Sequence, residues 1–468
     1  MSAVIPRREE TAARWLAVIL LGSLALRLGL AFATASLPPR IVDEQHYVSL
    51  AHSLATGHGF NFPNGPTSLR PPLYPWLVST IWRAVGAESL LAIRLVQAVL
   101  GVVTGLLAYR IGKDVFGEKA GLWAAGLTSA YPALVVAQVF VLTETLFALL
   151  VAATMAMVLS VLQRPRVASA IAAGVLLGAA ALTRSILYLY PVVLVPLLVV
   201  WMRAPLARRL AVAAAFCAGY LAIVTPWAMR NTHLQRVPVI VDTMGGMNLR
   251  MGNYEFTPHD RMWDAVGQEG ERSWIVGLPE HPPEGGTWTE GQKERWARGR
   301  AVAFMTAHPL LTAWRSSIKF GDFWALDRDF LAGVQRGLFA PPPVVTVIAG
   351  GLLAAAFPAA LALAILGVWR VPSRDVHGKV ILLLTVAFVC ALHTIVFAHP
   401  RYRLPLMPLV LVFSGAAIAS GAWRQFDLAT WRDRAALVTL AAFAGLWVIQ
   451  IAWRDWPAIA PLLSGRGV

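Results

Sequence analysis

Acidic residues that could act as a base lie directly beside long apolar segments of the sequence. Asp43 and Glu44 come a few residues after the first such segment and begin a run with apolar residues at helical spacing. Asp is favoured at the N-cap of a helix, so Asp43 could begin this one. Asp43 could also be a general base that takes a proton from an acceptor hydroxyl. The two roles are compatible, and the sequence leaves both open.

A third acid lies inside an apolar run. Glu144 is in VFVLTETLFALL, and a charged side chain at the centre of a membrane helix costs about 2.5–3.5 kcal/mol. Its retention favours a functional role or an ion pair with an arginine. Arg184, in LTRSI, is a candidate partner or a candidate phosphate ligand. Arg70 precedes a Pro-Pro pair that holds its backbone extended, and it could bind phosphate or extend toward lipid headgroups.

Two arginines and a tyrosine form a turn between two apolar segments. Arg401, Tyr402 and Arg403 belong to the sequence HPRYR. A guanidinium group matches the geometry of phosphate, so the turn is a candidate phosphate site. An anionic headgroup, or an ion pair with Glu44 or Glu144, is the alternative.

Metal and cofactor motifs are not visible in the sequence. It contains no Cys/His pattern typical of a metal site and no glycine-rich phosphate loop. Carboxylates beside a phosphate could bind a divalent cation. We nevertheless predict no metal site and no required cofactor, because arginines can neutralise the phosphate.

The elements that position these residues are membrane helices. The chain has 468 residues, of which 57% are hydrophobic and 14% are charged, whereas about a quarter are charged in a soluble domain. Apolar runs of the roughly 20 residues needed to cross a bilayer recur along the chain. We expect an all-α polytopic membrane protein with about eleven spans, at residues 15–37, 89–110, 120–136, 139–162, 168–184, 186–202, 210–228, 343–368, 379–397, 404–422 and 435–452.

The positions of the basic residues predict the topology. The net charge is +15, and the short loops at about 110–119, 164–166, 203–209, 370–379 and 424–434 are basic. The positive-inside rule places these loops and the N-terminus in the cytoplasm. This placement accounts for the basic residues without nucleic-acid binding. Residues 38–88 and 229–342 then lie outside.

The predicted organisation has three parts. Residues 1–228 form a transmembrane catalytic module that includes the first outer segment, residues 38–88. That segment should carry two interfacial helices, one after Asp43 and one from Pro71 to Val85. Residues 229–342 form a small α or α+β outer domain with a helix from Glu290 to His308. Residues 343–468 supply the last transmembrane helices.

Four segments together resemble a known class of enzymes. They are IVDEQHYVSLAHSLATGHGF with LRPPLYPWLVS, then FGEKAGLWAAGLTSAYPALVVAQVFVLTETLFALL, TPWAMRNTHLQRVPVIVDTMGGMNLRMGN and HPRYRLPLMPLVLV. In this order they resemble bacterial GT-C fold glycosyltransferases, the class of the protein O-mannosyltransferases and lipid A aminoarabinose transferases. The resemblance covers about residues 15–420.

This resemblance implies an inverting transfer of a sugar from a polyprenyl-phosphate carrier to an envelope lipid, glycan or protein. It makes Asp43 the catalytic aspartate, Glu144 a second acid on the outer face, and Arg70 the counterpart of a lysine. We predict Asp43, Glu44 and Glu144 as catalytic residues, and Arg70, Arg184, Arg401, Tyr402 and Arg403 as substrate-binding residues. The alternatives are an O-antigen ligase or polymerase and a polyprenyl-lipid flippase or transporter. A transporter should place ionisable residues near the membrane midplane, whereas these lie at the outer ends of the spans.

Overall fold

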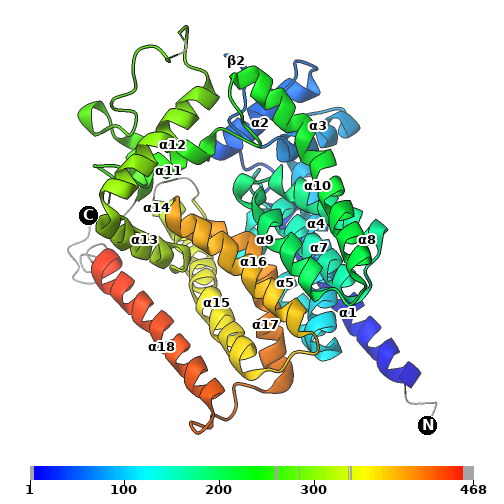
Figure 1. Cartoon of the computed structure of the whole chain (residues 1–468). Coiled ribbons are helices and arrows are strands. Elements are labelled where there is room, and N and C mark those ends of the chain that lie inside the picture. The colour runs from blue at the N-terminus through cyan, green and yellow to red at the C-terminus, as the bar shows by residue number, and fades with distance from the viewer. Residues whose placement is uncertain (1–4, 259–261, 284, 336, 338–339, 457–468) are drawn as a thin grey trace.

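Helices dominate the computed structural model, which describes residues 5–258, 262–283, 285–335, 337 and 340–456. Long helices pack into a bundle, and shorter helices lie across one of its ends (Figure 1). Within the described residues the only sheet is an antiparallel hairpin of β1 (Asn61–Phe62) and β2 (Gly65–Pro66). The prediction of an all-α polytopic membrane protein is confirmed.

Eight helices in the described part of the chain are long and apolar enough to cross a membrane. In chain order the structure bounds them as α1 (Ile5–Ala33), α4 (Leu90–Phe116), α7 (Glu144–Gln163), α10 (Leu206–Gln235), α15 (Pro343–Arg370), α16 (Val376–Ile395), α17 (Met407–Ser420) after the 3-10 turn η4 (Pro400–Leu406), and α18 (Trp431–Gln450), which continues into the π-helical turn η5 (Ile451–Asp455).

The expected count of eleven spans is not confirmed. Two of the expected spans are the shorter apolar helices α8 (Val167–Ala181) and α9 (Tyr190–Trp201). The expected span at 120–136 is divided into α5 (Glu118–Ala130) and α6 (Pro132–Ala137). The break falls at Tyr131, whose backbone is extended, because the residue before a proline is disfavoured in the helical region.

Glycines let two membrane helices approach closely. A Cβ atom on Gly174 of α8 would lie 2.1 Å from the Phe216 carbonyl oxygen, and one on Gly219 of α10 would lie 2.4 Å from the Ile171 carbonyl oxygen. Small residues at such contacts are usual in membranes, where van der Waals packing drives helix association. The short α8 is therefore fixed against α10.

The first outer segment carries the two expected helices, α2 (Val42–Ala55) and α3 (Leu73–Val85). They pack through Tyr47 and Tyr74, whose rings meet edge to face with centroids 5.2 Å apart. The Tyr74 hydroxyl donates to Gln97 Oε1 of α4 at 3.1 Å. These contacts seat the first outer segment on the bundle.

A buried arginine also fixes the entry to this segment. Arg94, 2% exposed, donates to the carbonyl oxygens of Thr34 at 2.5 Å, Ala35 at 3.1 Å, Leu37 at 2.6 Å and Val139 at 2.8 Å. It thereby joins the chain after α1 to the chain before α7.

The second outer segment is helical within its described residues. Its elements are α11 (Met244–Met251), the 3-10 turns η2 (Met262–Gly267) and η3 (Gly270–Arg272), α12 (Glu290–Ala307), α13 (Pro309–Phe323) and α14 (Asp329–Gln335). The helix expected from Glu290 to His308 is α12. At the end of α11 a Cβ atom on Gly252 would lie 2.1 Å from the Val396 carbonyl oxygen, just beyond α16. The segment is thus seated directly on the bundle.

The two outer segments lie at the same end of the bundle. Figure 1 shows α2, α3, α11 and α12 at the top of the view and the start of α1 at the bottom. Basic loops meet each other away from the outer segments: Arg374 N donates to the Val115 carbonyl oxygen at 2.8 Å, and Arg208 Nε donates to the Pro165 carbonyl oxygen at 3.0 Å. The two outer segments thus share one end of the bundle, and the side of the membrane on which that end lies stays a prediction.

Replacing Gly174 by Val should destabilise the protein, because the added atoms collide with the backbone of α10. Overpacking of this kind costs about 1–3 kcal/mol. Thermal unfolding of the purified protein in detergent should show a lower melting temperature. Gly29→Val on α1 is the matched control, since a Cβ there meets no atom within 4 Å. Equal melting temperatures for the two variants would contradict the close α8–α10 contact.

Candidate active site

Asp43 lies in the first turn of α2, where its carboxylate binds two arginines from distant parts of the chain. Oδ1 accepts a hydrogen bond from Arg70 Nη2 at 2.6 Å, and Oδ2 accepts one from Arg401 Nη1 at 3.2 Å. The Asp43 side chain is 22% exposed. The carboxylate therefore connects the first outer segment to the turn before α17.

Arg70 is positioned by hydrogen bonds in the loop that carries it. Ser68 N donates to Glu290 Oε2 at 2.7 Å, and Ser68 Oγ donates to Asn231 Oδ1 at 2.9 Å. These bonds tie the loop to α12 and α10. Arg70 Nη2 also donates to His46 Nδ1 at 2.9 Å. The guanidinium is thus held by α2, and the loop that carries it is held by α10 and α12.

Glu144 is the first residue of α7, and its carboxylate binds two arginines. Its Oε1 accepts from Arg401 Nε at 2.5 Å and from Arg184 Nη1 at 3.2 Å. The side chain is 2% exposed, and its second oxygen, Oε2, is buried without a hydrogen-bond partner. The Arg184 guanidinium lies over the Tyr402 ring, 5.3 Å from its centroid. The interpretation of Arg184 as a partner of Glu144 is therefore confirmed.

These contacts form one continuous network in which positive and negative side chains alternate. Its order is Arg70, Asp43, Arg401, Glu144, Arg184. Five of the eight predicted site residues thus form the network, and Tyr402 lies against its end. Their chemical roles stay predictions.

The arginines change the acidity of the candidate base. Burial alone would raise the pKa of Asp43, but the positive charges of Arg70 and Arg401 outweigh burial and hold that pKa below its usual value. Burial and Arg70 also lower the pKa of His46, whose neutral ring can accept from Arg70. Asp43 is therefore ionised, and it is a weak base while both arginines hold it.

Glu44 binds backbone amides. Its Oε2 accepts from Arg40 N and from Ile41 N, each at 3.1 Å, and its Oε1 accepts from Val141 N at 2.9 Å. The interpretation of Asp43 as the N-cap is wrong, because Ile41 holds that position and Glu44 completes the capping arrangement. Through these contacts Glu44 joins the start of α2 to the chain before α7.

Arg403 belongs to η4 and contacts the second outer segment. Its Nη1 donates to the Phe323 carbonyl oxygen at 2.8 Å, and its Nη2 pairs with Asp327. The guanidinium lies 3.5 Å from the centroid of the Phe357 ring. These contacts assign Arg403 a position in the scaffold, and its predicted role in substrate binding stays a prediction.

The sequence analysis missed Asp242, which lies between α10 and α11. Met244 N donates to its Oδ1 at 2.9 Å, and the Ser185 hydroxyl and the charge of Arg70 also act on the carboxylate. Burial raises the pKa of Asp242. A signal was present, since an acid between the apolar run VPVIV and a Gly-Gly pair needs a reason.

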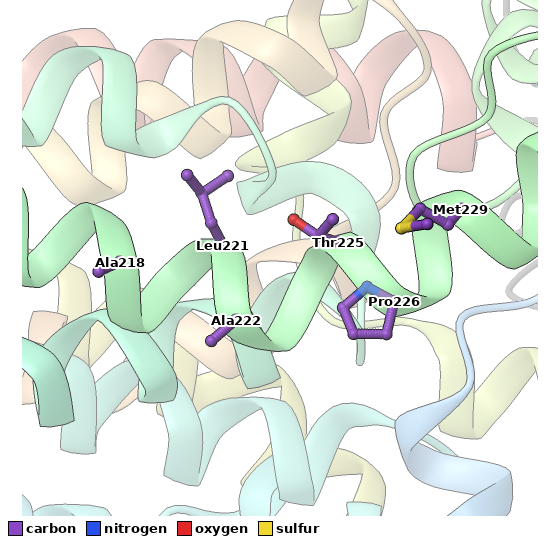
Figure 2. Close-up of a pocket in the computed structure, with 6 residues that line it drawn as sticks. All are labelled: Ala218, Leu221, Ala222, Thr225, Pro226 and Met229. Carbon is purple, nitrogen blue, oxygen red and sulfur yellow. The ribbon is translucent and has the colours of Figure 1, made fainter.

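A separate apolar groove lies along α10. Its volume is about 560 Å³, and its lining residues, from Ala218 to Met229, are shown in Figure 2. No charged side chain lines it, so it has no group that would bind phosphate. An apolar surface of this kind is expected where a membrane helix meets lipid.

A family model matches part of the sequence. Residues 69–229 match the model described as dolichyl-phosphate-mannose-protein mannosyltransferase. This segment is about a third of the chain and includes Arg70, Glu144 and Arg184, whereas Asp43 and Arg401 lie outside it. A search of curated protein sequences found no match.

Solved structures of an archaeal protein share the fold over nearly the whole chain. The oligosaccharyltransferase AglB from Archaeoglobus fulgidus, in complex with an inhibitory peptide and a dolichol-phosphate, has a TM-score of 0.50 and 14% identity, covering 95% of this chain and 56% of that one. The apo form of the oligosaccharyltransferase from the same organism has a TM-score of 0.50 and 15% identity, covering 94% of this chain and 56% of that one. ArnT from Cupriavidus metallidurans in the apo state has a TM-score of 0.40 and 16% identity, covering 88% of this chain and 78% of that one. The chain thus spans little more than half the length of the archaeal protein.

A double-mutant cycle of Asp43→Asn and Arg401→Gln should show a coupling free energy of about 1–3 kcal/mol at neutral pH. Unfolding of the purified protein in detergent measures it. The arginines depress the folded pKa of Asp43, so the coupling should persist above about pH 4 and disappear as the pH falls through the folded pKa.

The exposed pair of Lys113 and Glu118 is the control for this cycle, because their side chains are 47% and 33% exposed. Its coupling should be at most about 1 kcal/mol. A coupling no larger between Asp43 and Arg401 would contradict the network.

Proposed function

Because this chain has the GT-C fold of membrane glycosyltransferases, we propose that it transfers a sugar from a polyprenyl-phosphate donor to an envelope acceptor. The acceptor is a lipid, a glycan or a protein. The reaction takes place at the outer face of the bacterial inner membrane, with the N-terminus in the cytoplasm. The catalytic residue is Asp43, and the guanidinium groups of Arg70, Arg184 and Arg401 bind the phosphate.

One observation carries this proposal. The Asp43 carboxylate binds Arg70 and Arg401 at the same time, at 2.6 Å and 3.2 Å. A base and two phosphate-binding groups are therefore within reach of one substrate. Proton transfer and stabilisation of a leaving phosphate need this combination in a single site.

The proposed reaction is a single displacement with inversion. Asp43 takes the proton of the acceptor hydroxyl as that oxygen forms a bond to the anomeric carbon. The bond between this carbon and the phosphate oxygen breaks, and its electron pair stays with the phosphate. Arg70 and Arg401 stabilise the charge that develops there. The products are the glycosylated acceptor and the polyprenyl phosphate.

Donor binding should also prepare the base. While Arg70 and Arg401 hold Asp43, they lower its pKa and weaken it as a proton acceptor. A phosphate competes for the same guanidinium groups, which match its geometry well. When it displaces the carboxylate, Asp43 becomes a stronger base. The donor should therefore bind before the acceptor loses its proton.

The charges of the network support a phosphate ligand. Three guanidinium groups face two carboxylates in the bonded network, which leaves one positive charge in excess. A sugar phosphodiester carries one negative charge and would balance it. The archaeal protein of similar fold was solved with a dolichol-phosphate, which is the same class of carrier.

We propose that transfer needs no divalent cation. The arginines supply the positive charge that a cation would otherwise bring to the phosphate. Within the residues that the structure describes, no three His, Cys, Asp or Glu side chains form a group able to hold a metal ion.

Asp43→Asn should reduce sugar transfer by at least about 100-fold, the usual contribution of a general base. A deletion strain complemented with wild type or variant provides the assay, and mass spectrometry of the envelope fraction identifies the lost sugar. Glu88→Gln, on the same outer segment with a side chain 49% exposed, should restore transfer fully. Full transfer by Asp43→Asn would favour a ligase or polymerase mechanism, and a deletion strain that lost no sugar would overturn the enzyme assignment.

Transfer in washed membrane vesicles should continue at an unchanged rate after treatment with EDTA. The sugar identified in the deletion strain is the readout, and vesicles carrying Asp43→Asn provide the background. Loss of transfer with EDTA, restored by added Mg²⁺ or Mn²⁺, would show that the arginines are insufficient.

A further inference from the structure

We infer that Asp242 and Thr243, which precede α11, form a subsite for the ring hydroxyl groups of the donor sugar. This inference rests on the proposed function and extends it from the phosphate to the sugar. It assigns a substrate-binding role to the second outer segment.

The segment that carries these residues is fixed next to Arg70. Thr243 N donates to the Ser68 carbonyl oxygen at 3.0 Å, two residues before Arg70 in the chain. On its other side, Asn231 Nδ2 and Trp227 Nε1 of α10 donate to the Val241 carbonyl oxygen at 2.9 Å and 2.8 Å. The backbone here is therefore held in place before any ligand binds.

Thr243 has a buried hydroxyl without a hydrogen-bond partner. The residue is 0% exposed, and its Oγ1 is among the buried polar atoms without a partner. Thr243 occupies the N-cap position of α11, but its side chain does not cap the helix. Leaving such a group buried and unsatisfied is unfavourable. A ligand hydroxyl would remove this cost.

Asp242 supplies a carboxylate beside the phosphate-binding groups. Its Oδ1 accepts from Met244 N, and the Ser185 hydroxyl and the charge of Arg70 lie close enough to lower the pKa of the carboxyl group. No ion pair to Asp242 within 4 Å is found in the described part of the chain, whereas Asp43 and Glu144 each bind two arginines. The carboxylate therefore keeps capacity to accept hydrogen bonds from hydroxyl groups.

Arg70 completes the set of groups. Its Nη2 binds Asp43, whereas its Nε is buried without a partner. A carboxylate, a hydroxyl and a guanidinium N–H together can bind the alternating donors and acceptors of adjacent sugar hydroxyls. A free phosphate is a poor match for this subsite, because the Asp242 carboxylate repels it.

The position of Asp242 favours the donor sugar over the acceptor. Arg70 and Arg184 are proposed to bind the phosphate, and Asp242 interacts with Arg70 and with Ser185, the neighbour of Arg184 in the chain. The sugar is bonded directly to that phosphate, so its ring must lie beside these arginines.

Lipid binding by the purified full-length protein in nanodiscs tests the subsite. The probes are undecaprenyl phosphate and a panel of undecaprenyl phosphates that carry a hexose, a pentose or an aminopentose. We expect wild type to bind one sugar-linked lipid more tightly than the bare lipid. Asp242→Asn and Thr243→Val should each reduce this preference about tenfold, the loss expected for a hydrogen bond of about 1.4 kcal/mol. Their affinity for undecaprenyl phosphate should stay at the wild-type value.

Matched controls and the other outcomes separate this inference from the proposed function. Glu271→Gln and Thr306→Val, both exposed in the second outer segment, should leave both affinities unchanged, and melting temperatures check that every variant folds. An equal loss of affinity for both lipids in Asp242→Asn would make Asp242 a positioning residue for Arg70 and overturn the subsite. Wild type that binds the bare lipid without preferring any sugar would also overturn it. Wild type that binds no lipid would overturn the proposed function as well.

Discussion

The outer end of this protein depends on the pairing of guanidinium and carboxylate groups where an apolar bundle meets its cap. A charge left unpaired there would cost several kcal/mol, and removing one partner of a buried pair is strongly destabilising. The alternating network satisfies Asp43 and Glu144 with two arginines each. Its members come from α2, α7, η4 and two loops, so the network can form only when the whole outer end is folded.

The two outer segments both help to position this network. The first supplies Asp43 and Arg70, and the buried Arg94 fixes its entry by binding four backbone carbonyls. The second contributes Glu290, which binds Ser68 in the loop that carries Arg70. The position of Arg70 thus depends on both segments. A shift of the second segment would move Arg70, the proposed phosphate ligand, relative to Asp43, the proposed base.

Charges at the ends of apolar runs were the part of the site that sequence could predict, because few roles justify Asp43, Glu144 or Arg401 at such positions. The different roles of the adjacent acids Asp43 and Glu44 were harder to predict. Successive residues of a helix point about 100° apart, so Asp43 faces the arginines while Glu44 binds backbone amides. Asp242 could be noticed from its place between an apolar run and a Gly-Gly pair, but its approach to Arg70 is a tertiary contact that no local pattern predicts. The count of eleven spans is not confirmed. The extended residue before Pro132 divides one apolar run, and two other runs form the shorter helices α8 and α9.

The same pairing that stabilises the resting site also limits its chemistry. A carboxylate held by two guanidinium groups is stable, but it is a poor proton acceptor. A ligand that substitutes its own negative charge keeps the arginines satisfied and releases the base, so the exchange avoids an unpaired buried charge. Neutral hydroxyl groups cannot make this exchange. They can bind instead to buried polar atoms that have no hydrogen-bond partner, such as Thr243 Oγ1 and Arg70 Nε. The division between paired and unpaired polar atoms therefore separates the site proposed for the phosphate from the subsite proposed for the sugar.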